Sequence, residues 1–355
     1  MRKSNNLAIA SIGQYAKKRV DQANESIQHI SNMSNIHSEV INQLKSNIQS
    51  NARIGIHFHP YRKSKNGISV IEHLIESGYY KNQFETKISN GSLTAFKGGQ
   101  RDIWENLLFD KVFEKNNIEI SLRPKYGALS LIGHSDGPSP RFGSCYFLSN
   151  PRLCKYTTFT YLDSYFNPTE KGTIEIFDDI ISSILSESFQ RDATLGFKNI
   201  RPDKLIQHIN KYLSGELDLK FKTPLSRNLD HYIEAQIHTQ ISLLKDVEIL
   251  VADKAYQKTE YEKQFIELCK NYHLKLIWNR GLELKTNNVP DNFRGAEMPI
   301  IAKEIAINNK INAYSIAKAE NKISATSKDE SEIKKKNQLL KYLWHTLVKY
   351  GEPIE

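Results

Sequence analysis

The sequence contains little cysteine. Its 355 residues include only Cys145, Cys154 and Cys269, and no two of them have the Cys-x-x-Cys spacing of a zinc-ligand pair. Small secreted domains that depend on disulfides carry a much denser set of cysteines. We therefore expect neither a disulfide framework nor a structural zinc site, and we expect the chain to work in a reducing compartment.

Long apolar runs are also missing. No stretch of 18 consecutive apolar residues occurs, so the sequence predicts no membrane span. The N-terminal segment begins with charge, but Gln14, Lys17 and Lys18 interrupt its apolar residues, unlike the continuous apolar region of a signal peptide. We expect a cytoplasmic protein, or one exported as an effector by a machine that reads no signal peptide.

The chain does contain a surplus of basic residues and enough apolar residues for a large core. Lys and Arg number 49 against 40 Asp and Glu, which gives a formal net charge of +9. This balance favours anionic partners such as nucleotides, nucleic acid or acidic proteins, without choosing among them. With 39% hydrophobic residues, the chain suits one large domain with appendages or two smaller domains.

The pattern of apolar residues divides the chain into three parts. Residues 1–50 have apolar side chains at three- and four-residue steps and predict a helical cap of one or two amphipathic helices. Residues 51–255 mix strand and helix patterns and predict an α+β domain with a helical insertion at about 173–215. Residues 256–355 predict a helical extension whose final basic helix docks on the protein, rather than on a membrane or nucleic acid.

Within the central part, short strands alternate with helices. Gly78 is expected to end a helix over 67–78, because glycine readily takes the left-handed conformation that follows many helices. A short Gly- and Pro-rich loop after residue 132 is typical of a hairpin connection. The expected strands are 54–58, 93–96, 127–132, 143–148, 232–238 and 247–251, the last two joined by a short turn, and further helices begin near Trp104 and cover most of 173–214.

The stretch RIGIHFHPYR carries two histidines on one face of the first strand. Ile54, Ile56 and Phe58 alternate with polar or small residues, so period-two geometry directs these three side chains to the core. His57 and His59 then point to the opposite face. That face is either solvent or a site.

A second polar stripe lies on the strand around residue 235. Glu234, Gln236 and His238 share one face of this strand, between the apolar residues Ile233 and Ile237. A strand with a purely structural role has little reason to carry a carboxylate, an amide and an imidazole together. Glu234 is therefore the strongest candidate for a catalytic residue.

Six segments in a fixed order carry a resemblance to a bacterial family that is catalogued only as a domain of unknown function. They span about residues 53–255. The segments are HFHPYR, QFETKISNGSLTAF, GGQRDIWENLLF, RPKYGALSL, DGPSPRFGSCYF and EAQIHTQISLLKDVEILVAD.

The order of parts also resembles the ADP-ribosyltransferase superfamily. A strand ending in His or Arg, a helix, a strand pair with Ser or Tyr and a later strand opening with Glu-x-Gln follow that plan. The resemblance implies a mixed sheet split around a nucleotide cleft, NAD as the substrate, and mono-ADP-ribosylation of a macromolecule, most simply a protein. It also implies a bacterial toxin or effector, whose acceptor the sequence does not specify.

The resemblance assigns the catalytic acid to Glu234. Such enzymes usually have Glu where this sequence has Gln236, so Gln236 is expected to share the ribose with Glu234. A carboxylate there stabilises the positive charge that develops on the sugar when the bond to nicotinamide breaks. Ser144 and His238 complete the set expected around NAD.

Further residues are assigned to the remaining parts of NAD. His59, at the end of the first strand, is expected to hydrogen-bond the ribose hydroxyls, and it is better placed for this than His57. Arg62 or Arg123 would bind the pyrophosphate through the guanidinium fork. Tyr126 would stack on the nicotinamide ring.

Two functions from other classes compete with this assignment. The net charge of +9 and the basic final helix would suit a nucleic-acid-binding protein, although aromatic residues do not interleave with Lys and Arg in a reading motif. The His-x-His strand would suit a metal-dependent hydrolase. Its further ligands would come from His134, His231, His238 and Asp253.

Overall fold

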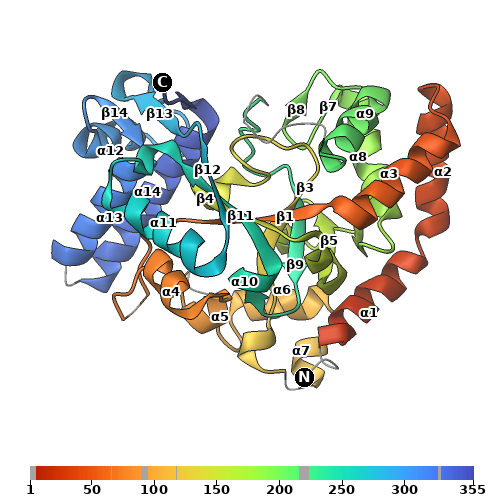
Figure 1. The fold of residues 1–355 in the computed structure, drawn as a ribbon, viewed down its shortest axis with the longest axis horizontal. Helices are drawn as coiled ribbons and strands as arrows, with labels where there is room; N and C mark the ends of the chain where they lie inside the picture. Colours follow the sequence, from red (N-terminus) through yellow and green to blue (C-terminus); the bar gives the residue numbers. More distant parts are fainter. Residues whose placement is uncertain (1–4, 65, 89–94, 117, 216–223, 327–328) are drawn as a thin grey trace.

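The fold is α+β, with a large mixed sheet at its centre and groups of helices around it (Figure 1). This computed structural model describes the chain except for residues 1–4, 65, 89–94, 117, 216–223 and 327–328. In the part that is described, no helix combines the length and apolarity needed to cross a bilayer.

The sheet has eight strands, and one pair of neighbours, β11 and β12, runs parallel while the other neighbours run antiparallel. Strand β12 comes from the predicted C-terminal extension, so the sheet continues across the boundary expected near residue 255. In spatial order the strands are β12 (Lys275–Asn279), β11 (Val247–Asp253), β4 (Cys145–Ser149), β1 (Arg53–Phe58), β3 (Lys125–Ser130), β9 (Ile233–Ile237), β5 (Thr157–Tyr161) and β6 (Lys171–Thr173).

The sheet opens between β1 and β3. These strands pair from Arg53 opposite Ser130 to Gly55 opposite Ala128, and the pairing stops there. Beyond this point β1 continues along β4 as far as Phe58, while β3 continues along β9. The end of β1 and the start of β3 therefore have different partners, and the gap between them provides space for a site.

Helices gather at two opposite ends of the molecule (Figure 1). At one end α2 packs on α8 and α3 packs on α9, while α12 and α13 pack on α14 at the other end. The helices are α1 (Asn5–Lys17), α2 (Val20–Met33), α3 (Ser38–Asn51), α4 (Val70–Ser77), α5 (Gln83–Thr86), α6 (Gln100–Leu108), α7 (Val112–Lys115), α8 (Asp178–Arg191), α9 (Pro202–Leu213), α10 (Leu243–Asp246), α11 (Glu260–Tyr272), α12 (Met298–Ile305), α13 (Ala313–Thr326) and α14 (Glu330–Tyr350).

Local signals in the sequence explain where helix α4 begins and ends. Ser69 and Glu72 form a reciprocal capping box at its start, which satisfies backbone N–H groups that have no partner inside the helix. Gly78 follows its end with a φ of 67°, the left-handed conformation predicted for it. The N-terminal cap contains three helices instead of one or two, because turns at Lys18 and Asn35 interrupt the apolar pattern.

The strand pairings differ from the sequence prediction in two places. Strands β3 and β4 do not form a hairpin, because β1 lies between them. Strands β9 and β11, expected as neighbours across a short turn, lie in different parts of the sheet, with β10 and α10 in the connection. The strand expected at 93–96 lies partly outside the described residues, and Ala95 and Phe96 are not in a strand.

Short strands outside the main sheet link the loops around it. The sequence prediction missed these pairs, as it missed β5, β6 and β12. They are β2 (Tyr79–Tyr80) with β10 (Ile241–Ser242), β7 (Ala193–Thr194) with β8 (Phe197–Lys198), and β13 (Leu282–Lys285) between β14 (Lys310–Asn312) and β15 (Glu352–Pro353).

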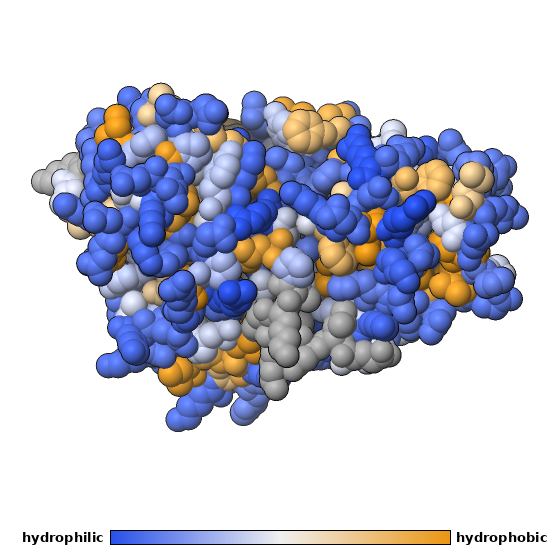
Figure 2. Space-filling model, turned by 90° about the horizontal axis from the view of Figure 1, so that it is seen from above, coloured by the Kyte–Doolittle hydropathy of each residue, from blue (hydrophilic) through white to orange (hydrophobic). Residues whose placement is uncertain are grey.

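One hydrophobic core joins the sheet to both groups of helices. It extends from Ile27 in α2 to Val348 in α14, and it includes Ile54, Ile56 and Phe58 of β1, as their alternation predicts. The helix α14 docks on the protein as expected, and its buried Trp344 donates a hydrogen bond to the Pro140 carbonyl at 2.9 Å. Hydrophilic residues cover most of the face shown in Figure 2, where apolar residues form separate patches.

Candidate functional site

A cavity of about 460 Å³ lies where the sheet opens. Its walls include residues of β1, β3 and β9 from the sheet, and residues of α6 and α14 from the helices. Two short helical turns, η2 (Pro140–Phe142) and η4 (Ser164–Phe166), also contribute to the wall. The cavity thus collects side chains from segments that are far apart in the sequence.

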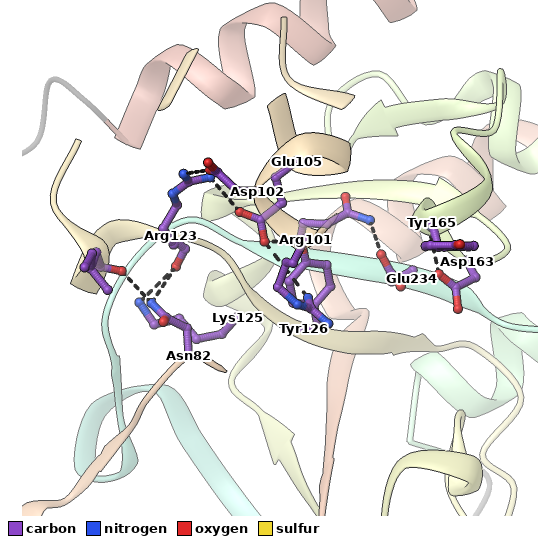
Figure 3. A network of polar contacts seen from close by, with 12 residues as sticks. Asn82, Arg101, Asp102, Glu105, Arg123, Lys125, Tyr126, Asp163, Tyr165 and Glu234 are labelled. Carbon is purple, nitrogen blue, oxygen red and sulfur yellow. Dashed lines mark hydrogen bonds and ion pairs between the residues drawn. The ribbon is translucent and has the colours of Figure 1, made fainter. Parts of the chain in front are cut away.

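Glu234 on β9 reaches this cavity from the sheet. Its side chain is buried, and its Oε1 accepts a hydrogen bond of 2.9 Å from the amide of Gln236 (Figure 3). Burial and the nearby Asp163 carboxylate raise the pKa of Glu234 to about 8, against the opposing effect of a hydrogen bond from Ser164. Glu234 is therefore a carboxyl group that holds its proton at neutral pH.

Gln236 lies beside Glu234 on the same face of β9, but it is not part of the cavity wall. Its carbonyl oxygen accepts a hydrogen bond from the Thr158 hydroxyl at 2.9 Å, and its amide also donates to the Thr160 hydroxyl at 3.1 Å. The fully buried amide is held by β5 on one side and bonds to Glu234 on the other. Gln236 thus orients the Glu234 carboxyl group through this hydrogen bond.

His57 on β1 lines the cavity as a neutral imidazole of fixed tautomer. Its Nδ1 lies 2.9 Å from the carbonyl oxygen of Gly143, which can only accept, so Nδ1 carries the proton. Its Nε2 accepts a hydrogen bond from the backbone N–H of Ser139 at 3.3 Å. Burial lowers the pKa of His57 to about 4, so the ring stays uncharged at neutral pH.

His59 lies away from the cavity wall, the reverse of the predicted placement of the two histidines. Strand β1 ends at Phe58, and the His59 ring packs against Tyr61 and Trp344 at centroid distances of 5.2 and 5.1 Å. Helix α14 thus covers His59, while the preceding histidine stays at the opening of the sheet.

Neither arginine assigned to the pyrophosphate lines the cavity. Arg123 is buried between Asp102 and Glu105, and its guanidinium lies 2.9 Å from Glu105 Oε2 (Figure 3). Arg62 is buried with its Nε 4.0 Å from Glu320 Oε1. Both guanidinium groups therefore have carboxylate neighbours in the fold.

Tyr126 on β3 lines the cavity, and two residues of α6 that the sequence reasoning missed join it there. The Arg101 guanidinium stacks between the rings of Trp104 and Tyr126, at 4.5 and 4.7 Å from their centroids. Tyr126 donates a hydrogen bond to Glu105 Oε1 at 2.8 Å. The signal that could have found them is an arginine and a tryptophan three residues apart on a helix that follows Gly98-Gly99.

Ser144 and His238 lie outside the cavity wall. The Ser144 hydroxyl is buried against the Tyr256 hydroxyl at 3.1 Å. His238 is hydrogen-bonded to the Thr158 hydroxyl at 2.8 Å, and burial lowers the pKa of its ring to about 3. Of the nine residues named for the site, the cavity wall contains His57, Tyr126 and Glu234.

The ligands expected for a hydrolase do not come together in the described part of the chain. No group of three or more His, Cys, Asp or Glu side chains there could hold a metal ion. His134, for example, is hydrogen-bonded to the Leu195 carbonyl at 3.0 Å, and Asp253 caps a turn through the N–H of Ala255. The His-x-His motif thus lacks partners of the predicted kind among the described residues.

The fold and the cavity define an α+β protein with a buried carboxyl group at an opening in a mixed sheet. Residues 53–350 match the family described as Protein of unknown function (DUF3626), so the chain belongs to this family. The predicted membership of an uncharacterised family is thereby confirmed, and the match extends beyond the six segments into α14. A search of curated proteins finds no match.

Proposed function

We propose that the protein is an NAD-dependent mono-ADP-ribosyltransferase that modifies a protein acceptor. The observation that carries this proposal is the buried Glu234 carboxyl group facing the cavity from β9, with His57 and Tyr126 on the two strands that separate. An imidazole on β1, a tyrosine on β3 and a carboxyl group on β9 follow the order of site residues along the chain that the ADP-ribosyltransferase resemblance implies.

The chemistry that NAD cleavage requires is available at Glu234. When the bond between nicotinamide and ribose breaks, positive charge develops on the sugar, and an ionised carboxylate beside it stabilises the transition state. Gln236 holds this group in place through its 2.9 Å hydrogen bond. The neutral imidazole of His57, whose two ring nitrogens bond to the backbone of Gly143 and Ser139, adds no positive charge that would oppose the reaction.

The size and the lining of the cavity also support a nucleotide ligand. A volume of about 460 Å³ lies within the range of small-molecule and cofactor sites, roughly 300–1,000 Å³. Tyr126, Trp104 and Tyr165 supply aromatic rings on which a nicotinamide or adenine ring can stack. Arg101 adds a cation that its aromatic neighbours already orient.

Transfer of label from NAD to a cell lysate tests the proposal. We expect the wild type to label a lysate protein, and we expect Glu234→Gln to lower nicotinamide release by about two to three orders of magnitude, because one preorganised electrostatic partner is lost. The substitution keeps the size of the side chain, so circular dichroism should show an unchanged fold.

Gln236→Glu is the matched variant on the same strand face. It replaces the buried amide with the acid usual in the superfamily, and because a carboxylate cannot donate the hydrogen bond that holds Glu234, we expect lower activity than in the wild type. Equal labelling by wild type and Glu234→Gln would reject Glu234 as the catalytic acid. If no variant released nicotinamide or labelled any protein, the transferase proposal itself would fail.

A further inference from the structure

Helix α14 supplies a second set of polar residues to the same cavity. Lys341 and His345, one helical turn apart, line its wall together with Arg141 from η2. Lys341 and His345 lie in the part of the chain predicted as a helical extension, whereas Arg141 belongs to the central part.

His345 is a buried polar side chain without a hydrogen-bond partner in the described part of the chain. Its exposure is 2%, and both ring nitrogens are unpaired among the residues described. Burial, followed by the nearby Arg294, Arg141 and Lys341, lowers its pKa to about 2. A buried imidazole with both nitrogens unused is costly unless another group bonds to it.

Lys341 is a half-buried cation in positive surroundings. Burial and three arginines, Arg141, Arg62 and Arg294, lower its pKa to about 8. Arg141 pairs with Asp230, whose side chain is 69% exposed at the surface. The Nε atom of Arg141 is buried and has no hydrogen-bond partner among the described residues. Cations brought together in this way repel one another unless an anion lies between them.

The part of the cavity around Glu234 differs from the part around Lys341 in the sign of the nearby charges. The charge that most affects Glu234 is the carboxylate of Asp163, whereas the charges that affect Lys341 are all arginines. NAD has a matching polarity, since its nicotinamide carries a positive charge and its diphosphate carries negative charges. A ligand of this type can satisfy both parts of the cavity at once.

We infer that Lys341 and His345 of α14, with Arg141 of η2, form a binding subsite for a diphosphate group. Lys341 provides a point charge, Arg141 provides guanidinium donors, and an N–H of the neutral His345 donates to a phosphate oxygen. The identification of this group as the diphosphate of NAD depends on the proposed function. The binding of a phosphate anion does not depend on it.

Calorimetric titration of the full chain with inorganic pyrophosphate tests the subsite. We expect the wild type to bind, and Lys341→Met to weaken binding by roughly ten- to a hundredfold, as for the loss of one charge-assisted hydrogen bond. Lys335→Met removes the same charge from an exposed position of the same helix and should leave the affinity within about twofold. Lys341→Arg should restore most of the binding, and His345→Gln should weaken it by about three- to tenfold.

Two results would overturn the inference: no binding of pyrophosphate by the wild type, or the same affinity in wild type and Lys341→Met. Assays of NAD cleavage separate this failure from a failure of the proposed function. If pyrophosphate binds through Lys341 but no nicotinamide is released, the subsite stands and the transferase is rejected. If NAD is cleaved but Lys341→Met changes neither pyrophosphate affinity nor the KM for NAD, the subsite is rejected and the transferase stands.

Discussion

The protonation of one carboxyl group decides what the cavity can do at a given pH. Burial keeps Glu234 protonated up to about pH 8, yet only its ionised form can stabilise a positive sugar. The protonated form has the shape of the site without the charge that the proposed chemistry needs. The pH dependence of the reaction therefore reports directly on this residue.

We predict that nicotinamide release at subsaturating NAD rises as the pH increases from 6.5 and levels off above about 8. The sign follows from the raised pKa, because the ionised fraction of Glu234 grows as the pH passes through that value. Initial rates across this range check it. A profile that is flat or falls with pH would contradict Glu234 as the group that must be ionised.

We predict that the free energy of unfolding also depends on the ionisation of Glu234. Because the pKa of Glu234 is raised from 4.5 to about 8 on folding, its contribution to stability is fully present below pH 4.5 and declines as the pH rises toward 8. Glu234→Gln cannot titrate, so its unfolding free energy should lack this decline. Urea unfolding of both proteins at pH 5 and pH 8 measures the difference.

At the residue scale, the sequence pattern identified which side chains have the chemistry of a site, but not which other side chains they contact in the fold. Alternation indicated that His57 and His59 share a face, and Glu234 stood out as a carboxylate between isoleucines. Which histidine lines the cavity depends on Trp344, which packs on His59 from 285 residues further along the chain. A local pattern contains no information on such a contact.

Helix α6 is held against strand β3 by buried polar contacts, and this anchoring positions Arg101 and Trp104 at the cavity. Arg123, immediately before β3, pairs with Asp102 and Glu105 of α6. Burial raises the pKa of Glu105 to about 7, although Arg101 and Arg123 oppose that shift. The arginine thus compensates two carboxyl groups that the fold has removed from water.

We predict that Arg123→Met destabilises the fold by about 3–5 kcal/mol, the usual range when one partner of a buried ion pair is removed. Arg152→Met is the control, because Arg152 pairs with Asp246 at the surface with 52% of its side chain exposed, and its loss should cost at most about 1 kcal/mol. Urea unfolding at pH 7.5 measures both values. Similar small losses in the two variants would show that the buried network contributes little.

The sequence predicted well those helices whose ends are set by nearby residues. It did not predict which strands pair with one another in the sheet. Helices α4, α8, α9 and α14 follow from periodicity, caps and terminal glycines, all of which act within a few residues. The position of β1 between β3 and β4 depends on contacts across the whole domain. Strand β5 was missed although its sequence, TTFTY, is rich in β-branched and aromatic residues.

At the scale of the whole molecule, the cavity joins segments from His57 to His345. A ligand that spans it contacts the sheet, the turn η4 and the helix α14 together. Binding energy is then shared among all of these elements, which stabilises their packing against one another.

We predict that NAD slows amide hydrogen exchange in the segments 163–166 and 338–346 at the same time. Both segments contribute residues to the cavity wall, and a ligand that binds only the folded form suppresses local unfolding of each segment. Exchange measured by mass spectrometry with and without NAD checks this, with α2 as the internal reference. Protection limited to one of the two segments would mean that the ligand does not span the cavity.

The position of α14 in the sequence also sets the order of events during synthesis. The sheet strands that hold Glu234 and His57 are complete once residue 279 has been made, but Lys341 and His345 are added later. A nascent chain on the ribosome therefore has Glu234 and Arg141 of the cavity before it has Lys341 and His345. The proposed phosphate subsite would be complete only when residue 345 has left the exit tunnel and α14 has docked.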